Sequence, residues 1–339
     1  MEKENSHFPL LDIVRYFAAL LVAVFHYFLY QSNNFIYEYI VSISVEVFFV
    51  LSGFVLANQI NSIRDKGFRF RDLRTFLLRR WMRTIPPYLI AVIVAIFIFG
   101  GGDLQNIFLH ILYLQNFITD HQSRAFFSVG WSLSIEEWFY IIFPLTLLIF
   151  SKFWDVRNSN IHVSIIIIIL CIFCRYYFGS TDNWGQDVRR TVIFRLDAIV
   201  VGYLAFCIKE KLSNKNIFVF GILSTILFAV TTWNNSDLVQ SEFYQNLFFV
   251  SCGLFFSFLL ILLSRLSPLI GHNTGSSFSF LARLSYPIYL FHIILIALIG
   301  DIFSQSNFLI YIALLHGFAI VFHYTFEKPI LSVRPKYNK

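Results

Sequence analysis

Residues 10–30 read LLDIVRYFAALLVAVFHYFLY, an apolar stretch of membrane-spanning length that contains one arginine, Arg15, and one histidine, His26. Eleven residues at about 100° each make almost three turns of an α-helix, so both side chains leave the same face of the predicted helix. They stand roughly 16 Å apart along its axis, about half the hydrocarbon thickness of a bilayer. An arginine at the centre of a spanning helix costs about 2.5–3.5 kcal/mol on insertion scales. We therefore expect this face to border a polar cavity within the membrane.

The composition of the chain predicts that lipid surrounds most of it. Hydrophobic residues make up 57% of the 339 residues and charged residues only 14%, which is more apolar surface than a soluble protein of this length could bury. We predict an all-α, polytopic membrane helix bundle of about ten transmembrane helices. The predicted spans lie near 10–30, 36–57, 84–100, 135–151, 161–178, 192–208, 216–233, 243–264, 284–300 and 307–326.

The basic residues predict the orientation of these helices. With a cytoplasmic N-terminus, 20 of the 26 lysines and arginines fall on the inner side, and only Arg124, Arg189 and Arg190 fall on the outer side. Inner loops of membrane proteins carry such an excess of basic residues, so we expect both termini in the cytoplasm. Basic groups on that face meet anionic lipid or a phosphorylated substrate, and the net charge of +6 does not call for nucleic acid.

Residues 1–339 are expected to form a single membrane domain with no appended soluble domain. No polar loop is long enough to fold alone. No cleavable signal is apparent, because the first apolar run is long and carries ionisable residues. Cys171 and Cys174 have CxxC spacing but lie in a predicted span, so we expect them to pack inertly and expect no metal site.

Residues 76–88 read FLLRRWMRTIPPY and follow the second predicted span. Arg80 and Arg83 lie one helical turn apart, so their guanidinium groups, together with that of Arg79, can hold a phosphate-bearing ligand. Ordinary positive-inside charge also explains arginines here, but the eight basic residues within 64–83 exceed what orientation requires. The paired prolines of this stretch are predicted to begin the third span.

Residues 131–140 read WSLSIEEWFY and place two adjacent carboxylates, Glu136 and Glu137, at the outer start of the fourth predicted span. Acidic residues favour a helix N-terminus and tryptophans favour membrane interfaces, so a structural role accounts for both. The functional alternative is an acidic mouth, lined by aromatic rings such as that of Trp131, which receives a sugar.

Residues 285–292 read SYPIYLFH and place Ser285, Tyr289 and His292 at i, i+4 and i+7, on one helix face. Such a stripe in a membrane helix forms a hydrogen-bonding network, which is either structural or part of a substrate site. If the network is part of a substrate site, we expect Tyr289 and His292 to contact the substrate.

Other ionisable residues also fall within predicted spans. Glu46 is a functional candidate that needs a partner, and the alternative is a carboxylate that reaches the membrane surface. Ser52 and Gly53, almost two turns further on, mark a point where another helix backbone can approach closely. Arg195 and Asp197 are expected to form a structural ion pair.

Together these motifs resemble bacterial acyltransferase family 3, in the order LDIVRYFAALLVAVFH, VEVFFVLSGF, FLLRRWMRTIPPY, WSLSIEEWFY, FRLDAIVVG, SYPIYLFH and FEKP. The resemblance covers residues 10–330. It implies a multi-pass enzyme of the bacterial cytoplasmic (inner) membrane that moves an acyl group, usually acetyl, from cytoplasmic acyl-CoA to a hydroxyl of a cell-surface or exported glycan. O-antigen, exopolysaccharide and oligosaccharide are such acceptors. The chain departs from the family at Glu46, where Asp is more frequent.

The resemblance also implies roles for individual residues. The family's essential arginine and histidine on the first helix match Arg15 and His26, its paired arginines match Arg80 and Arg83, and its acidic residue after the last helix matches Glu327. The implied partners are acyl-CoA, as a co-substrate and not as a permanently bound cofactor, a glycan or lipid-linked sugar acceptor, and membrane lipids.

These roles give a hypothesis for the reaction. The phosphates of acyl-CoA bind the arginines after the second span, and the pantetheine arm runs along the first helix beside Ala18 and Val22. His26 then acts as a general base on the acceptor hydroxyl, or carries the acyl group itself. Glu327 is the expected partner of Arg15.

A proton-coupled transporter, or a flippase of a glycan or small molecule, is the alternative function. Buried arginine, histidine and glutamate residues also suit proton relays in membranes. Carriers tend to show inverted repeats and paired broken helices, however, and the sequence shows neither. The sequence therefore favours the enzyme.

Overall fold

The computed structural model describes residues 7–32, 34–117, 126–151, 156–179, 187–233, 241–302 and 307–336. Within these residues the chain is helical and has no strand, and nine of its helices are long and apolar enough to cross a membrane. The predicted all-α, polytopic membrane bundle is confirmed. The helices are α1 (Pro9–Gln31), α2 (Phe35–Asp65), α3 (Phe70–Phe99), α4 (Leu104–Ile111), α5 (Gly130–Phe150), α6 (Val156–Phe178), α7 (Asp187–Arg190), α8 (Val192–Ile208), α9 (Asn214–Trp233), α10 (Glu242–Leu266), α11 (His272–Ile302), α12 (Phe308–Phe322) and α13 (Lys328–Ser332).

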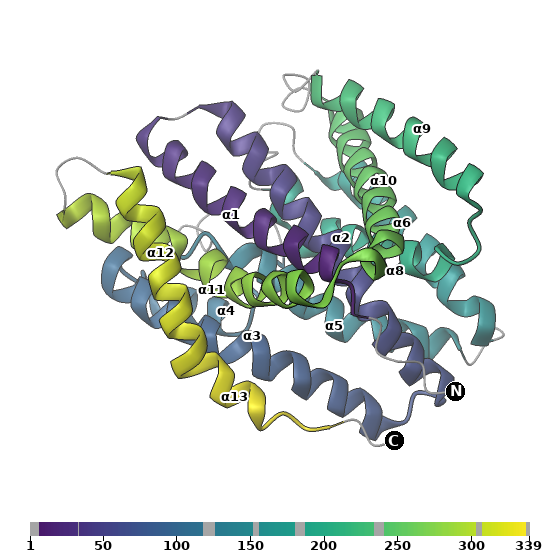
Figure 1. The fold of residues 1–339 in the computed structure, drawn as a ribbon, viewed down its shortest axis with the longest axis horizontal. Coiled ribbons are helices and arrows are strands. Elements are labelled where there is room, and N and C mark those ends of the chain that lie inside the picture. Colours follow the sequence, from purple (N-terminus) through teal and green to yellow (C-terminus); the bar gives the residue numbers. More distant parts are fainter. Residues whose placement is uncertain are drawn as a thin grey trace.

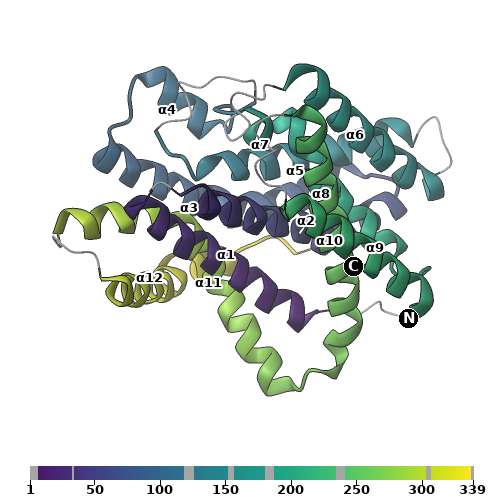
Figure 2. The ribbon, with the colours of Figure 1, turned by 90° about the horizontal axis from the view of Figure 1, so that it is seen from above.

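Helices α1 and α2 pack against each other in the middle of the bundle. Helix α1 also packs on α11, and α11 packs on α12. Helix α2 packs on α8 and α10. Figures 1 and 2 show α12 on one side of this central pair and α9 with α10 on the opposite side. The first apolar helix of the sequence is therefore a central element of the fold.

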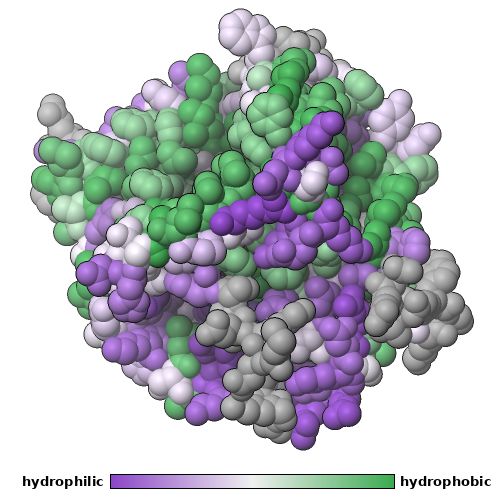
Figure 3. All heavy atoms as spheres, turned by 45° about the vertical axis from the view of Figure 1, so that its right-hand side comes forward, coloured by the Kyte–Doolittle hydropathy of each residue, from purple (hydrophilic) through white to green (hydrophobic). Residues whose placement is uncertain are grey.

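The outer surface of the bundle is apolar over much of its area. Phe97, Leu104 and Trp233 are 85%, 85% and 88% exposed. Figure 3 shows hydrophobic residues over the upper part of one face and hydrophilic residues gathered over its lower part. Large exposed apolar side chains in such number suit contact with lipid, as expected of a multi-pass membrane protein.

Helix α3 begins much earlier than predicted, at Phe70, and runs through Pro86 and Pro87 without ending. The prediction that these prolines begin the span is therefore wrong. Leu73 and Phe76 are buried, so tertiary packing holds the basic first half of the helix and outweighs the disfavoured prolines.

Helix α8 coincides with the predicted span 192–208, but its 17 residues are fewer than the ~20 that usually cross a bilayer. Its contact with α2 is very close, because a Cβ atom at Gly53 would meet the backbone of Ile199 and one at Gly202 would meet that of Val50. The predicted close-packing point at Gly53 is confirmed.

Candidate active site

A cavity of about 770 Å³, counting the part open to solvent, lies between α1, α2, α3, α5 and α11. Polar and apolar side chains both line it. The charged members are Arg15, Arg80, Arg83 and Glu136, and the apolar members include Val45, Phe48, Phe49 and Leu133.

Three arginines from two helices meet at this cavity. Arg15 of α1 is 19% exposed, with Asp12 at the 4.0 Å limit of an ion pair, and Arg80 and Arg83 of α3 are half-buried. Nη2 of Arg80 donates a hydrogen bond to Gln59. Guanidinium groups gathered in this way suit an anion such as a phosphate.

Arg79 does not join these three. Its Nη1 donates a 2.6 Å hydrogen bond to the carbonyl of Pro335 in the tail that follows α13, and it does not line the cavity. Neighbouring helical positions differ by about 100° in direction, which separates Arg79 from Arg80. The prediction that Arg79 shares the anion site is wrong for this geometry.

Glu136 lies inside the cavity with the arginines, and not at an outer mouth as predicted. Its carboxylate accepts hydrogen bonds from Ser52, at 2.7 Å, and from Tyr140, at 3.1 Å. The reason is that α5 begins at Gly130, earlier than the expected residue 135, so Glu136 sits almost two turns into the helix. One negative charge therefore faces the three positive charges.

Glu137 points elsewhere. It is buried, accepts a 2.5 Å hydrogen bond from the hydroxyl of Thr84 on α3, and does not line the cavity. Tyr286 of α11 donates to the carbonyl of the same threonine. Glu137 thus helps to join α5 to α3, and the predicted sugar contact at this residue is not supported by its position.

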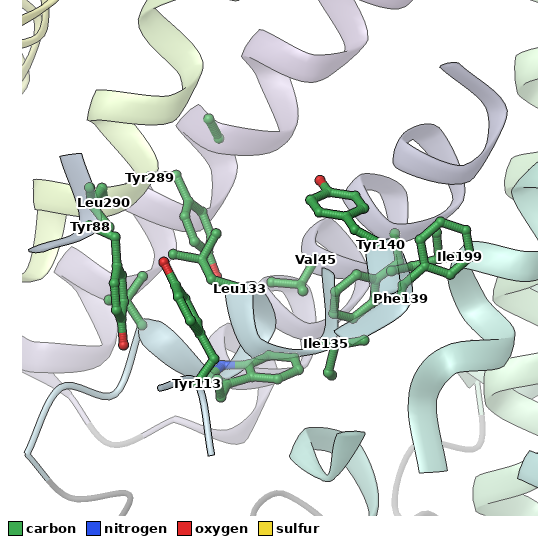
Figure 4. Packing of buried hydrophobic residues seen from close by; sticks show 14 of the residues in the cluster. Val45, Tyr88, Tyr113, Leu133, Ile135, Phe139, Tyr140, Ile199, Tyr289 and Leu290 are labelled. Atoms are coloured by element: carbon green, nitrogen blue, oxygen red, sulfur yellow. The ribbon is translucent and has the colours of Figure 1, made fainter. Parts of the chain in front are cut away.

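Apolar and aromatic side chains also line the cavity. Figure 4 shows Val45, Leu133 and Tyr289, which come from α2, α5 and α11. The ring of Phe48 lies 5.5 Å from that of Tyr289, and the Tyr289 hydroxyl is 2.5 Å from the hydroxyl of Ser132. Tyr289 therefore lines the cavity, and its contact with the substrate stays a prediction.

His26 does not line the cavity, although Arg15 does. Its ring is half-buried and lies 4.9 Å from the ring of His292, which in turn lies 6.0 Å from that of Tyr289. The expectation that Arg15 and His26 face one cavity is thus met for the arginine only. Tyr289, which lines the cavity, contacts His292, and His292 contacts His26.

The small side chains between Arg15 and His26 pack against other helices. Ala18 and Val22 are buried, at 3% and 1% exposure, and do not line the cavity. The cavity therefore does not follow this part of α1, and the path of a pantetheine arm beside it stays a prediction.

Glu327 lies in a short π-helical turn, His323–Glu327, that links α12 to α13. Its carboxylate is 2.8 Å from Nδ1 of His323, so the expected direct pairing with Arg15 is wrong. The positive charge of Arg83 nevertheless acts on Glu327 from α3. π-Helical turns are frequent at functional sites.

Trp131 is buried at the start of α5 and does not line the cavity. The guanidinium groups of Arg189 and Arg190 lie 5.7 and 5.9 Å from its ring centre. Arg189 also hydrogen-bonds Ser42 and pairs with Glu38 at 3.4 Å. Burial lowers the pKa of the Arg189 guanidinium, and the Glu38 carboxylate opposes that shift. Trp131 thus stacks with arginines, and its predicted sugar contact is not supported.

A second group of charges is buried between α2, α6 and α8, away from the cavity. Glu46 pairs with Arg195 at 2.6 Å, and Asp197 pairs with Arg175 at 2.8 Å, whereas Arg195 and Asp197 are 4.0 Å apart. Arg195 therefore takes Glu46 as its main partner, and the expected Arg195–Asp197 pair is the weaker contact.

Sequence reasoning missed several polar residues of the cavity. Ser132 and Tyr140 were missed, yet they lie four residues before and four after the predicted Glu136, which is the spacing of one helix face, so the stretch WSLSIEEWFY did contain the signal. Ser52 was assigned to packing, yet its hydroxyl binds Glu136.

The fold and this site define a class of protein: a membrane helix bundle with an arginine-rich and partly apolar cavity in its interior. Residues 8–326 match the family model described as "Acyltransferase domain", so the chain belongs to the acyltransferase family, which confirms the resemblance.

Two relatives agree with this assignment. The chain is 24% identical over 346 residues to "O-acetyltransferase OatA" of Staphylococcus aureus (strain NCTC 8325 / PS 47), which covers 92% of this chain and 55% of the relative. It is 32% identical over 180 residues to "Peptidoglycan O-acetyltransferase OatA" of Listeria monocytogenes. This match covers 48% of this chain and 27% of the relative. The chain thus spans about half the length of the Staphylococcus relative, and its match spans about a quarter of the Listeria relative. No solved structure matches it.

Proposed function

We propose that this protein is a membrane O-acyltransferase that moves an acyl group, most simply acetyl, from acyl-CoA to a hydroxyl of a glycan. The observation that carries the proposal is a cavity with two kinds of lining, the guanidinium groups of Arg15, Arg80 and Arg83 and apolar side chains such as Phe48 and Leu133. Acyl-CoA has the same two-sided character, because it joins a phosphorylated nucleotide to an apolar acyl thioester.

The arginine part of the cavity is assigned to the phosphates of the donor. Guanidinium groups bind phosphate oxygens with two parallel hydrogen bonds, and a partly desolvated site strengthens each of them. Glu136 faces the same space and orients the arginines when no anion is bound.

The apolar part of the cavity is assigned to the acyl group. Phe48, Leu133 and Tyr289 line it, and Tyr289 contacts His292, the partner of His26. An acyl thioester held there lies on the side of the cavity nearest to the histidine pair.

His26 is assigned as the general base. It is partly exposed, and a neutral imidazole can take the proton of the acceptor hydroxyl while the oxygen attacks the thioester. Such assistance typically contributes 10²–10⁴-fold to the rate. The similarity to a peptidoglycan O-acetyltransferase favours a cell-wall or other surface glycan as acceptor.

The proposal is tested with the purified full-length protein in nanodiscs, supplied with radiolabelled acetyl-CoA and soluble peptidoglycan fragments. We expect label to enter the glycan as an alkali-labile ester, and Arg83→Gln to lower this incorporation at limiting acetyl-CoA. Absence of labelled ester with every acyl-CoA and glycan tried, together with absence of acyl-CoA binding, would contradict the proposal. A flux assay in proteoliposomes would then test transport.

A further inference from the structure

The rings of His26 and His292 form a pair whose hydrogen bonds determine where their protons lie. Nδ1 of His292 is 2.6 Å from the carbonyl oxygen of Tyr289. Nδ1 of His26 is 3.0 Å from the carbonyl oxygen of Val22 and 3.0 Å from Nε2 of His292. A carbonyl oxygen only accepts hydrogen bonds, so in each neutral ring Nδ1 carries the proton.

One arrangement of protons satisfies all three contacts. Because Nδ1 of His292 donates to Tyr289, its Nε2 has a lone pair and accepts the Nδ1 proton of His26. The other nitrogen of His26, Nε2, then holds the lone pair. The opposite tautomers would point a lone pair of each Nδ1 at a carbonyl oxygen and would lose the hydrogen bonds to Tyr289 and Val22.

We propose that His292 is a positioning residue that holds His26 in the tautomer whose Nε2 is the basic nitrogen. This inference rests on the acyl transfer proposed above. In that reaction the acceptor hydroxyl gives its proton to Nε2 of His26 while its oxygen bonds to the thioester carbon. The C–S bond then breaks and the same proton passes to the sulfur, which leaves an ester and a free thiol.

The burial of the two rings separates their roles. Neither ring lines the cavity, but His292 is 0% exposed whereas His26 is partly exposed. His292 therefore acts through His26, and the predicted direct contact of His292 with substrate is wrong for this geometry. When His26 gains a proton, its Nδ1–H becomes a charged donor, and the bond to Nε2 of His292 strengthens.

Two substitutions at His292 separate the hydrogen bond from simple packing. His292→Leu removes the acceptor, whereas Oε1 of glutamine in His292→Gln lies where Nε2 lay and still accepts. With hydrolysis of acetyl-CoA as the probe and water as the acceptor, we expect His292→Leu to lower kcat about 10–100-fold with KM changed less than about twofold. We expect His292→Gln to stay within about fivefold of the wild type.

His316 of α12 offers a matched control. Its Nδ1 also contacts a backbone carbonyl, that of Ile312, at 2.8 Å, and its Nε2 lies 2.7 Å from the hydroxyl of Tyr16. Because this pair lies apart from the cavity, His316→Leu is expected to leave the rate of hydrolysis unchanged.

A second measurement needs no turnover. The ¹⁵N spectrum of histidine-labelled protein in lipid, with His26 assigned by the signal lost in His26→Gln, is expected to show neutral His26 protonated at Nδ1 and bare at Nε2. A protonated Nε2 in the wild type would overturn the inference, as would equal losses in His292→Leu and His292→Gln, or none. If acetyl-CoA is not turned over but His26 shows the expected tautomer, the proposed function fails while the proton assignment stands.

Discussion

Nη2 of Arg195 lies 2.6 and 2.7 Å from the two carboxylate oxygens of Glu46, and both side chains are almost completely buried. This contact ties α8 to α2. The same helix, α2, supplies Phe48 and Ser52 to the cavity. The ion pair therefore positions one wall of the candidate site without facing it, which assigns Glu46 a structural partner and not a substrate.

Glu46→Ala is expected to destabilise the protein by about 3–5 kcal/mol, because it leaves the guanidinium of Arg195 buried without its carboxylate. The matched control is Glu38→Ala. Glu38 is 35% exposed and pairs with Arg189 at 3.4 Å, so its loss is expected to cost about 1 kcal/mol or less. Denaturant unfolding in detergent measures both. Equal losses in the two variants would contradict the assignment.

Gly53→Ala and Gly202→Ala are each expected to weaken the contact between α2 and α8, because the added methyl group meets backbone that cannot rotate away. We expect a loss of about 1–3 kcal/mol in the free energy of unfolding for each. Gly317→Ala is the control, since a Cβ atom there meets nothing within 4 Å, and helix propensity predicts a neutral or slightly stabilising effect. A stable Gly53→Ala variant would mean that the helices lie further apart.

Arg83→Gln is expected to raise KM for acetyl-CoA about 10–100-fold with a much smaller effect on kcat, because one charge-assisted contact to phosphate is worth about 1.5–3 kcal/mol. Arg79→Gln provides the comparison. It removes a charge four residues away that binds Pro335 and does not line the cavity, so KM should stay within about twofold of the wild type. Equal increases in KM for both variants would indicate a diffuse surface potential and not a built anion site.

Phe48→Ala is expected to shift donor preference toward longer acyl chains, since the ring lines the apolar part of the cavity beside Tyr289. Two additional methylene groups buried there would add about 1.6 kcal/mol, or roughly tenfold in the ratio of butyryl to acetyl transfer. Phe97→Ala, at a side chain 85% exposed on the outer surface of α3, should leave this ratio unchanged. An unchanged ratio in Phe48→Ala would place the acyl group elsewhere.

Local sequence predicted much of the fold and part of the site. Long apolar runs fixed the existence of the spans, and the one-turn spacing of Arg80 and Arg83 correctly brought both to one cavity with Arg15. Contacts between residues that are far apart in the sequence could not be predicted from local patterns. Glu46 and Arg195 are 149 residues apart, and only the packing of α2 on α8 makes them partners.

Wrongly predicted helix starts caused the largest errors in the predicted site. Placing the start of α5 at residue 135 put Glu136 at the membrane surface, whereas the true start at Gly130 puts it in the interior. The start depends on where α5 packs against its neighbours, which local propensity does not determine. The role of His292 was hidden for a related reason, since its partner lies 266 residues away on α1.

The most direct test of the proposed chemistry compares the wild type with His26→Ala in nanodiscs, using radiolabelled acetyl-CoA without a glycan. We measure release of CoA and, in parallel, equilibrium binding of acetyl-CoA. The general-base role predicts slow release by the wild type, a rate at least about 100-fold lower in His26→Ala, and unchanged binding. Release at the wild-type rate by His26→Ala would contradict it.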